Sequence, residues 1–194
     1  MKTGKYKSMA ASAVLALGVA APVAAVPVEW TVGSGGNGHF YEFIDARTSW
    51  TAARTAAQAS SHLGQQGYLA TITSAGEQAF LLGLASDGWL GGTDQTVEGE
   101  WRWADGPEAG NLFWTGGPGG TASGFASWNA GEPNNSGNED YVHLQGGRWN
   151  DLPTSSTVGG RFVEFNAHAV PLPGTLSLAC LALTALLLSR RRTV

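Results

Sequence analysis

Five oxygen-bearing side chains in the C-terminal half of the sequence are spaced so that a hairpin could gather them. Glu132, Asn134 and Glu139 lie in one turn-forming segment, and Asn150 and Asp151 stand at the end of an expected strand. Such oxygens suit Ca²⁺, which takes about six to eight of them in flexible geometry. Together with the Asp151 carbonyl, they would leave room for about two oxygens from outside. The set predicts a calcium site open to a ligand.

The hydroxyl groups of a sugar could supply those outside oxygens. Two neighbouring hydroxyls could bind the ion and also hydrogen-bond to its protein ligands, because amides donate and carboxylates accept. The alternative is that residues 132–138 form an ordinary polar turn, since Pro, Asn, Ser and Gly all favour turns. The combination of Glu-Pro-Asn with Glu139 and with Trp149-Asn150-Asp151 favours the calcium interpretation over a bare turn.

Catalytic chemistry has weaker support in the sequence. The four histidines are scattered without the spacing of a zinc site or a catalytic triad; they are His39, His62, His143 and His168. Glu132 and Glu139 could form a glycosidase pair. Both are already assigned as cation ligands, however, and a calcium-bound carboxylate is a poor proton donor because the ion favours its charged form. We therefore predict a protein that is not an enzyme.

The elements that would position these residues form an α+β pattern. Residues 39–44 alternate as in a strand. Residues 50–62 are expected to form a helix capped by Ser49 and ended by Gly64. Residues 68–72 read as a strand, and Ser74 to Glu77 form a capping box that starts a second helix, ended by Asp87-Gly88. Further short strands are expected at 89–92, 100–103, 141–144, 147–150 and 161–165.

Between these strands, residues 104–131 are rich in Gly, Pro, Asn and Thr and are expected to form one long loop. Four aromatic residues would anchor it, and they are Phe113, Trp114, Phe125 and Trp128. Trp101, Trp103 and Trp149 fall in expected strands. They could stack on a sugar, but their positions favour the core.

Both ends of the chain have the features of targeting segments. Residues 1–25 contain three lysines, a short apolar run and the small residues Val23-Ala24-Ala25, which predicts a cleaved signal peptide; the alternative is a membrane anchor. Residues 26–38 are expected to be a linker, followed by one domain at 39–166. Residues 167–194 contain Val170-Pro171-Leu172-Pro173, an apolar run and three arginines. The positive-inside rule leaves those arginines in the cytoplasm and the domain outside.

This tail resembles the PEP-CTERM sorting signals of Gram-negative bacteria. The resemblance implies membrane attachment through the tail, recognition by an exosortase and removal of the tail. It also implies a final location on the cell surface, at the outer membrane or in the extracellular matrix. Leu172 stands where the usual motif has Glu. A plain tail anchor is the alternative.

Charge and cysteine usage exclude several classes of protein. Residues 26–170 hold five arginines and fifteen acidic residues, a net charge of −10, which argues against a nucleic-acid partner. The single cysteine is Cys180, inside the apolar tail. The expected domain therefore has no disulfide, no zinc thiolate and no cysteine nucleophile.

From about residue 39 to residue 165 the sequence resembles the C-type lectin-like domain family. The likeness is carried by Trp89-Leu90-Gly91-Gly92, Trp128-Asn129-Ala130-Gly131, the Glu-Pro-Asn segment and Trp149-Asn150-Asp151. It implies an α+β fold in which two helices pack on short antiparallel sheets beside a long calcium-binding loop region. It also implies a cis Glu132-Pro133 bond, and a principal calcium whose ligands also contact the sugar: Glu132, Asn134, Glu139, Asn150 and Asp151. The Glu-Pro-Asn form goes with mannose-, glucose- or fucose-type ligands, and the Gln-Pro-Asp form with galactose.

The same resemblance implies an auxiliary calcium. Asp94, Glu98, Asn135 and Asp140 match the family's ligands for this ion, with Glu139 shared; the alternative is a solvated acidic hairpin. The family's disulfides are absent. The sequence thus predicts an exported, calcium-dependent carbohydrate-binding protein. A non-sugar adhesion or matrix protein with the same fold is the alternative.

Overall fold

The computed structural model describes residues 26–168. The expected signal peptide, and the expected sorting tail beyond residue 168, lie outside the described residues. Within the described range, no helix has both the length and the apolar character needed to cross a membrane.

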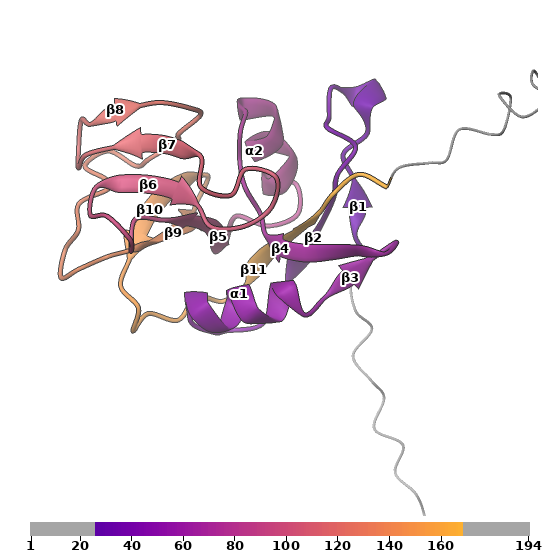
Figure 1. Cartoon of the computed structure of the whole chain (residues 1–194), viewed down its shortest axis with the longest axis horizontal. Coiled ribbons are helices and arrows are strands. Elements are labelled where there is room, and N and C mark those ends of the chain that lie inside the picture. The colour runs from indigo at the N-terminus through magenta and orange to yellow at the C-terminus, as the bar shows by residue number, and fades with distance from the viewer. Residues whose placement is uncertain (1–25, 169–194) are drawn as a thin grey trace, which may run out of the picture.

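The described chain forms two α-helices, one short 3₁₀ turn and eleven short strands (Figure 1). In chain order they are β1 (Val28–Glu29), η1 (Val32–Ser34), β2 (Phe40–Ile44), α1 (Trp50–Gln58), β3 (Ser61–His62), β4 (Gln65–Leu69), α2 (Ala75–Leu82), β5 (Asp87–Thr93), β6 (Glu100–Trp103), β7 (Leu112–Thr115), β8 (Thr121–Ala122), β9 (Tyr141–Gln145), β10 (Arg148–Leu152) and β11 (Arg161–Phe165).

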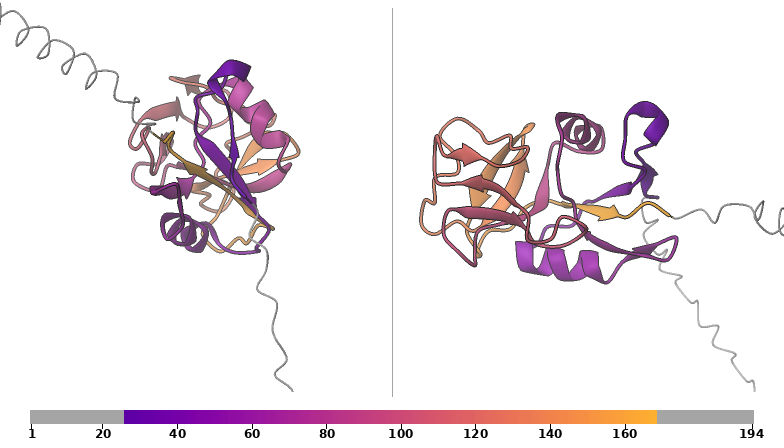
Figure 2. Two further views of the ribbon diagram at one scale, coloured as in Figure 1. Left: turned by 90° about the vertical axis from the view of Figure 1, so that its right-hand side faces the viewer. Right: turned by 45° about the horizontal axis from the view of Figure 1, so that its top comes forward.

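The strands form one branched, mixed sheet. Its main path runs β1-β2-β11-β5-β6-β7-β8, while β4 joins through β11 and β9 links β5 to β10. The β11–β5 pair is parallel and the other strand pairs are antiparallel, so the expected short antiparallel sheets are joined by one parallel pair. Strands β1 to β4 lie at one end of the molecule and β6 to β10 at the other, as the views in Figures 1 and 2 agree.

Helix α1 begins where the sequence predicts and ends earlier. The Ser49 hydroxyl accepts a hydrogen bond from the Ala52 backbone N–H, and Trp50, Ala53 and Ala57 are buried. The helix stops at Gln58 instead of His62. Gly64, expected to end it, instead has a positive φ of 80° in the turn between β3 and β4. Glycine adopts that conformation readily, so the same residue suits either role.

Helix α2 also differs from its expected form at both ends. Ser74 accepts from the Glu77 backbone N–H at 3.1 Å, as a capping box requires. The Glu77 carboxylate, however, accepts from the Thr73 N–H at 2.7 Å and not from Ser74. The helix ends at Leu82, and Asp87-Gly88 begins β5, because both residues pair with β9.

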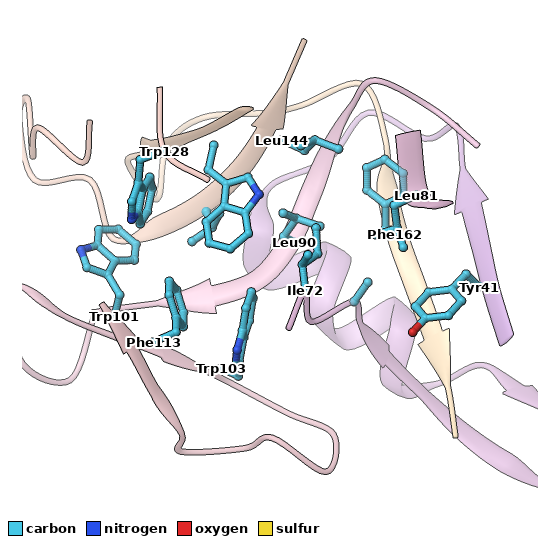
Figure 3. Close-up of a cluster of buried hydrophobic side chains, with 13 residues drawn as sticks. Tyr41, Ile72, Leu81, Leu90, Trp101, Trp103, Phe113, Trp128, Leu144 and Phe162 are labelled. Atoms are coloured by element: carbon cyan, nitrogen blue, oxygen red, sulfur yellow. The ribbon is translucent and has the colours of Figure 1, made fainter. Parts of the chain in front are cut away.

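The long segment 104–131 is not a simple loop, since it contributes β7 and β8 to the sheet. Phe113 and Trp128 anchor it as expected, with 2% and 9% of their surfaces exposed. Trp101, Trp103 and Trp149 are core residues, as predicted. Figure 3 shows Trp101, Trp103, Phe113 and Trp128 gathered in one buried cluster, with aromatic rings in edge and stacked contacts.

Residues 26–38, expected to be a linker, contribute to the domain. Strand β1 pairs with β2, and Trp30 stacks on Phe80 of α2 with ring centroids 5.8 Å apart. The resulting N-terminal hairpin covers α2 on the side away from the loop region (Figure 1).

Candidate metal centre

Asp151 holds the loop that contains the Glu-Pro-Asn segment. Asp151 is fully buried near the C-terminal end of β10. It lies on the same face of the strand as Trp149, which is also buried. One carboxylate oxygen accepts from the Asn134 N–H at 3.1 Å, and the other accepts from the Asn135 N–H at 2.8 Å. Asp151 therefore fixes the loop backbone directly.

The loop then folds back on itself through Ser136. The Ser136 N–H donates to Asn134 Oδ1 at 2.8 Å and to Glu139 Oε2 at 2.9 Å. The Glu139 N–H donates to Asn135 Oδ1 at 2.7 Å. Asn135 has a positive φ of 50°, which asparagine tolerates better than most residues. These contacts bring Asn134, Glu139 and Asp151 into one small volume.

Glu132 stands beside this group. The Glu132-Pro133 bond is cis, as the family resemblance implies. Burial, together with the neighbouring carboxylates of Asp151 and Glu139, raises the pKa of the Glu132 carboxyl to about 7. Its Oε2 is buried and has no hydrogen-bond partner among the described residues. The site thus contains a carboxylate oxygen that has no partner within residues 26–168.

The pKa of the Glu139 carboxyl is also raised. Burial and the charge of Asp151 raise its pKa, while the Ser136 N–H opposes the shift. Asn150 joins the group through Asp151, because its amide nitrogen donates to the Asp151 carbonyl at 2.6 Å. Its side chain is partly exposed at the edge of the group.

Three of the four residues expected at the auxiliary site line a small cavity. This cavity, of about 30 Å³, is bordered by Asp94, Glu98 and Asn135, and also by Asp151. Asp94 is 2% exposed, and burial together with Glu98 and Asp140 raises its pKa to about 7. One of its oxygens accepts from the Gly99 N–H at 2.9 Å, while Oδ1 is buried without a partner among the described residues.

Asp140, the fourth residue expected at the auxiliary site, contacts Asp94 through its backbone. Its backbone carbonyl accepts from the Asp94 N–H at 3.3 Å, and both of its carboxylate oxygens accept from the Asn138 amide at 3.2 Å. It does not border the cavity. Asn135 donates to Glu98 at 2.7 Å, which links the two groups.

Three residues of the candidate site were not predicted from the sequence. Gly116 and Gly117 border the cavity, and Ser136 bridges two expected ligands through its backbone N–H. The run Gly116-Gly117-Pro118-Gly119-Gly120 could have signalled a close approach of two backbones. A Cβ atom on Gly117 would lie 3.4 Å from the Pro133 carbonyl oxygen.

The residues present fit a hard cation held by mixed donors. In residues 26–168, no three His, Cys, Asp or Glu side chains gather closely enough to hold a metal by themselves. The amide oxygens of Asn134, Asn135 and Asn150 would therefore have to complete any coordination sphere. Two orphaned carboxylate oxygens, on Glu132 and Asp94, are the observation that favours a cation over a plain polar turn.

The sequence model of the Lectin C-type domain matches residues 46–158, and the chain belongs to this family. Halomucin of Haloquadratum walsbyi is 40% identical over 111 residues, which make up 56% of this chain and 1% of halomucin. The C-type lectin domain family 4 member M of Nomascus concolor is 35% identical over 129 residues, 64% of this chain and 28% of that protein. The chain thus spans less than a third of the length of these relatives.

Solved structures show the same fold. The cow C-type carbohydrate-recognition domain of CD23, in the presence of a GlcNAc2Man3 oligosaccharide, has a TM-score of 0.55 and 28% identity, over 69% of this chain and 92% of that one. The C-type lectin CEL-I of Cucumaria echinata has a TM-score of 0.53 and 25% identity, over 69% and 94%. A calcium-independent type II antifreeze protein also shares the fold, with a TM-score of 0.54 at 22% identity, over 74% and 96%.

Proposed function

We propose that this chain binds carbohydrate through a calcium ion held by Glu132, Asn134, Glu139, Asn150 and Asp151. The observation that carries the proposal is the buried, unpartnered Glu132 oxygen beside two further carboxylates. A cluster of this kind is unfavourable when all its members are charged, and a divalent cation would stabilise it. Membership of a family with carbohydrate-recognition domains supports the sugar part of the proposal.

The residues around the ion would have different roles in sugar binding. When bound, calcium would offer open coordination positions to two sugar hydroxyls. Glu132 and Glu139 would accept hydrogen bonds from those hydroxyls, and the Asn134 and Asn150 amides would donate to them. Asp151 would keep the loop in place through its contacts with the Asn134 and Asn135 N–H groups. We assign no catalytic role to any of these residues.

The ligand class that we propose is mannose-, glucose- or fucose-type, because the loop carries Glu-Pro-Asn. Glycan-array binding with and without a chelator tests the proposal. We expect mannose-type binding that is lost in chelator. The double substitution Glu132→Gln and Asn134→Asp should shift the preference towards galactose. Binding that persists unchanged in chelator would contradict the calcium-bridged mechanism.

We also propose a second, auxiliary ion at Asp94, Glu98, Asn135 and Asp140, with Glu139 shared. The unpartnered Asp94 oxygen and the small cavity beside it support this site. Calorimetric titration of the chain with calcium should then give two binding events, and Asp94→Asn should remove one of them while the glycan-linked event remains.

The non-sugar alternative has one specific observation behind it, which is the fold shared with a calcium-independent antifreeze protein. The chelator experiment decides between the two functions, since an adhesion or matrix role without sugar gives no glycan signal in either condition.

For location, we propose export by residues 1–25 and sorting of residues 39–166 to the surface or matrix of a Gram-negative cell by residues 167–194. Membrane attachment through that tail would precede cleavage by an exosortase-type enzyme. Cell fractionation of the full chain, compared with a chain lacking the three terminal arginines, tests this proposal through a change in size and location of the product.

A further inference from the structure

A groove separate from the proposed calcium ligands lies between α2 and the turn that joins β9 to β10. Its volume is about 380 Å³, within the usual range of about 300–1,000 Å³ for small-molecule pockets. Ala75, Ala79 and Leu82 form one wall, because residues three and four apart share a helix face. Residues 125–127 and the Gly147-Arg148 end of the turn form the other.

Gln78 borders this groove and has one unsatisfied polar atom. Only 9% of the residue is exposed. Its amide nitrogen donates to Ser127 Oγ and to the Gly147 carbonyl, both at 2.9 Å, and these two bonds fix the orientation of the amide. Its Oε1 is buried, and none of the described residues donates to it. A buried amide oxygen without a donor is unfavourable.

Arg148 borders the same groove and adds a positive charge. Its side chain is exposed. The ion pairs found in residues 26–168 involve His39, Arg54, Arg102 and His143, so Arg148 takes part in none of them. The five arginines of this range face fifteen acidic residues, so most of the surface would repel an anion. An unpaired guanidinium at this groove favours a carboxylate there.

The third feature of the groove is its apolar lining. Ala75, Ala79 and Ala126 present small side chains, and the ring of Phe125 is partly buried beside them. A ligand for this groove therefore needs an anionic group for Arg148 and an apolar face. A sugar ring that carries a carboxylate has both, because its carboxylate is charged and its C–H face is apolar.

We propose that this groove is a second binding subsite, which takes an acidic sugar residue of the uronic-acid type and needs no calcium. The choice of a saccharide over an acidic peptide rests on the proposed function. It is also supported by position, because Arg148 and Asn150 are two residues apart on β10, about 7 Å along the strand. The groove therefore lies next to Asn150, one of the proposed calcium ligands.

The test is a titration of the ¹⁵N-labelled full chain with methyl α-glucuronide in the presence of EDTA, followed by NMR. We expect shifts of α2 and of the β9–β10 turn, and binding of methyl α-glucoside at least tenfold weaker. Arg148→Gln should weaken glucuronide binding at least tenfold, and Ala79→Trp should abolish it by filling the groove. Arg47→Gln is the matched control, because Arg47 is an exposed arginine that contacts Thr157 elsewhere, and it should bind as the wild type does.

Two results would overturn the subsite: glucuronide binding that survives both Arg148→Gln and Ala79→Trp, or none in EDTA with the wild-type chain. Preferential binding of a triglutamate peptide in the groove would overturn the saccharide assignment. Glucuronide binding in EDTA together with no calcium-dependent glycan signal supports the subsite and contradicts the proposed function alone, so the two failures are distinguishable.

Discussion

Single carboxylates in the loop region do two different jobs. Asp151 has both oxygens bonded to backbone N–H groups, so it shapes the loop whether or not an ion is bound. Glu132 and Asp94 each have one buried oxygen to which nothing in the described part of the chain donates. These two residues therefore bring negative charge that the protein alone does not compensate.

The substitution Glu132→Gln should therefore raise the stability of the calcium-free protein and lower its affinity for calcium. Replacing Glu132 with Gln removes a charge that lies close to Asp151 and Glu139. Without calcium, the repulsion falls, so we expect Glu132→Gln to melt at a higher temperature than the wild type. With calcium, a ligand is lost, and we expect calcium affinity to fall at least tenfold. Melting curves in EDTA and calorimetric titration with calcium measure the two effects.

Asp45→Asn is the control for this prediction, because Asp45 is an exposed carboxylate that directly follows β2 and is not part of the loop that contains Glu132 and Glu139. It should change neither the melting temperature in EDTA nor the calcium affinity. A Glu132→Gln protein that melts lower than the wild type in EDTA would show that the Glu132 carboxylate is stabilising without an ion.

At the scale of elements, the two glycines of Trp89-Leu90-Gly91-Gly92 lie where β5 has no room for a side chain. A Cβ atom on Gly91 would lie 2.5 Å from the Leu69 carbonyl oxygen, and one on Gly92 would lie 2.5 Å from a Val142 methyl group. The backbones of β4 and β5 approach so closely that no side chain fits between them.

Gly91→Ala should therefore destabilise the domain by overpacking, which costs about 1–3 kcal/mol. The comparison is Gly33→Ala, since a Cβ atom at Gly33 meets nothing within 4 Å and should change stability by less than about 0.5 kcal/mol. Denaturant unfolding monitored by tryptophan fluorescence measures both. Equal stability of the two variants would mean that β5 can move away from Leu69.

Elements with strong local signals were predictable from the sequence. Ser49 marks the start of α1, and the alternation of residues 100–103 and 161–165 marks β6 and β11. The errors occur where one residue suits two structures. Gly64 can end a helix or turn a hairpin, and the tertiary pairing of β4 with β11 selects the hairpin.

The candidate ligands could be named from the sequence, but their grouping could not be derived from it. The link between Asn135 and Asp151 depends on the β9–β10 pairing and on the path of the intervening loop. Gly116 and Gly117 border the cavity only because β7 pairs with β6 in the sheet. The residues of β7 have no clear periodicity in the sequence. Such long-range contacts are set by the packing of the whole domain.

The domain formed by residues 26–168 contains none of the disulfide bonds that stabilise many small domains. The only cysteine of the chain is Cys180, so no disulfide can form within the described residues. A native disulfide contributes about 2–4 kcal/mol. One calcium ion at a hundredfold excess over its dissociation constant would add about 2.7 kcal/mol, a comparable amount.

We therefore expect the melting temperature of the chain to rise strongly with calcium. Magnesium at the same concentration should have a smaller effect, because it prefers a tight octahedral site and retains its water. A reducing agent should have none. Differential scanning calorimetry across a calcium series measures this, and a melting curve that does not respond to calcium would refute the idea that the ion takes the place of the disulfides.

The path of the chain also determines how the domain would carry a load. The described chain begins next to β1 and ends just after β11, and both of its ends lie beside β2, at the end away from β6 to β10 (Figure 1). A pull on the two flanks would pass from β1 through β2 to β11, across hydrogen bonds between neighbouring strands. The loop that contains Glu132 and Glu139 lies off this path. Tension on the flanking segments would thus be borne by one end of the sheet, while the loop region at the other end kept its shape.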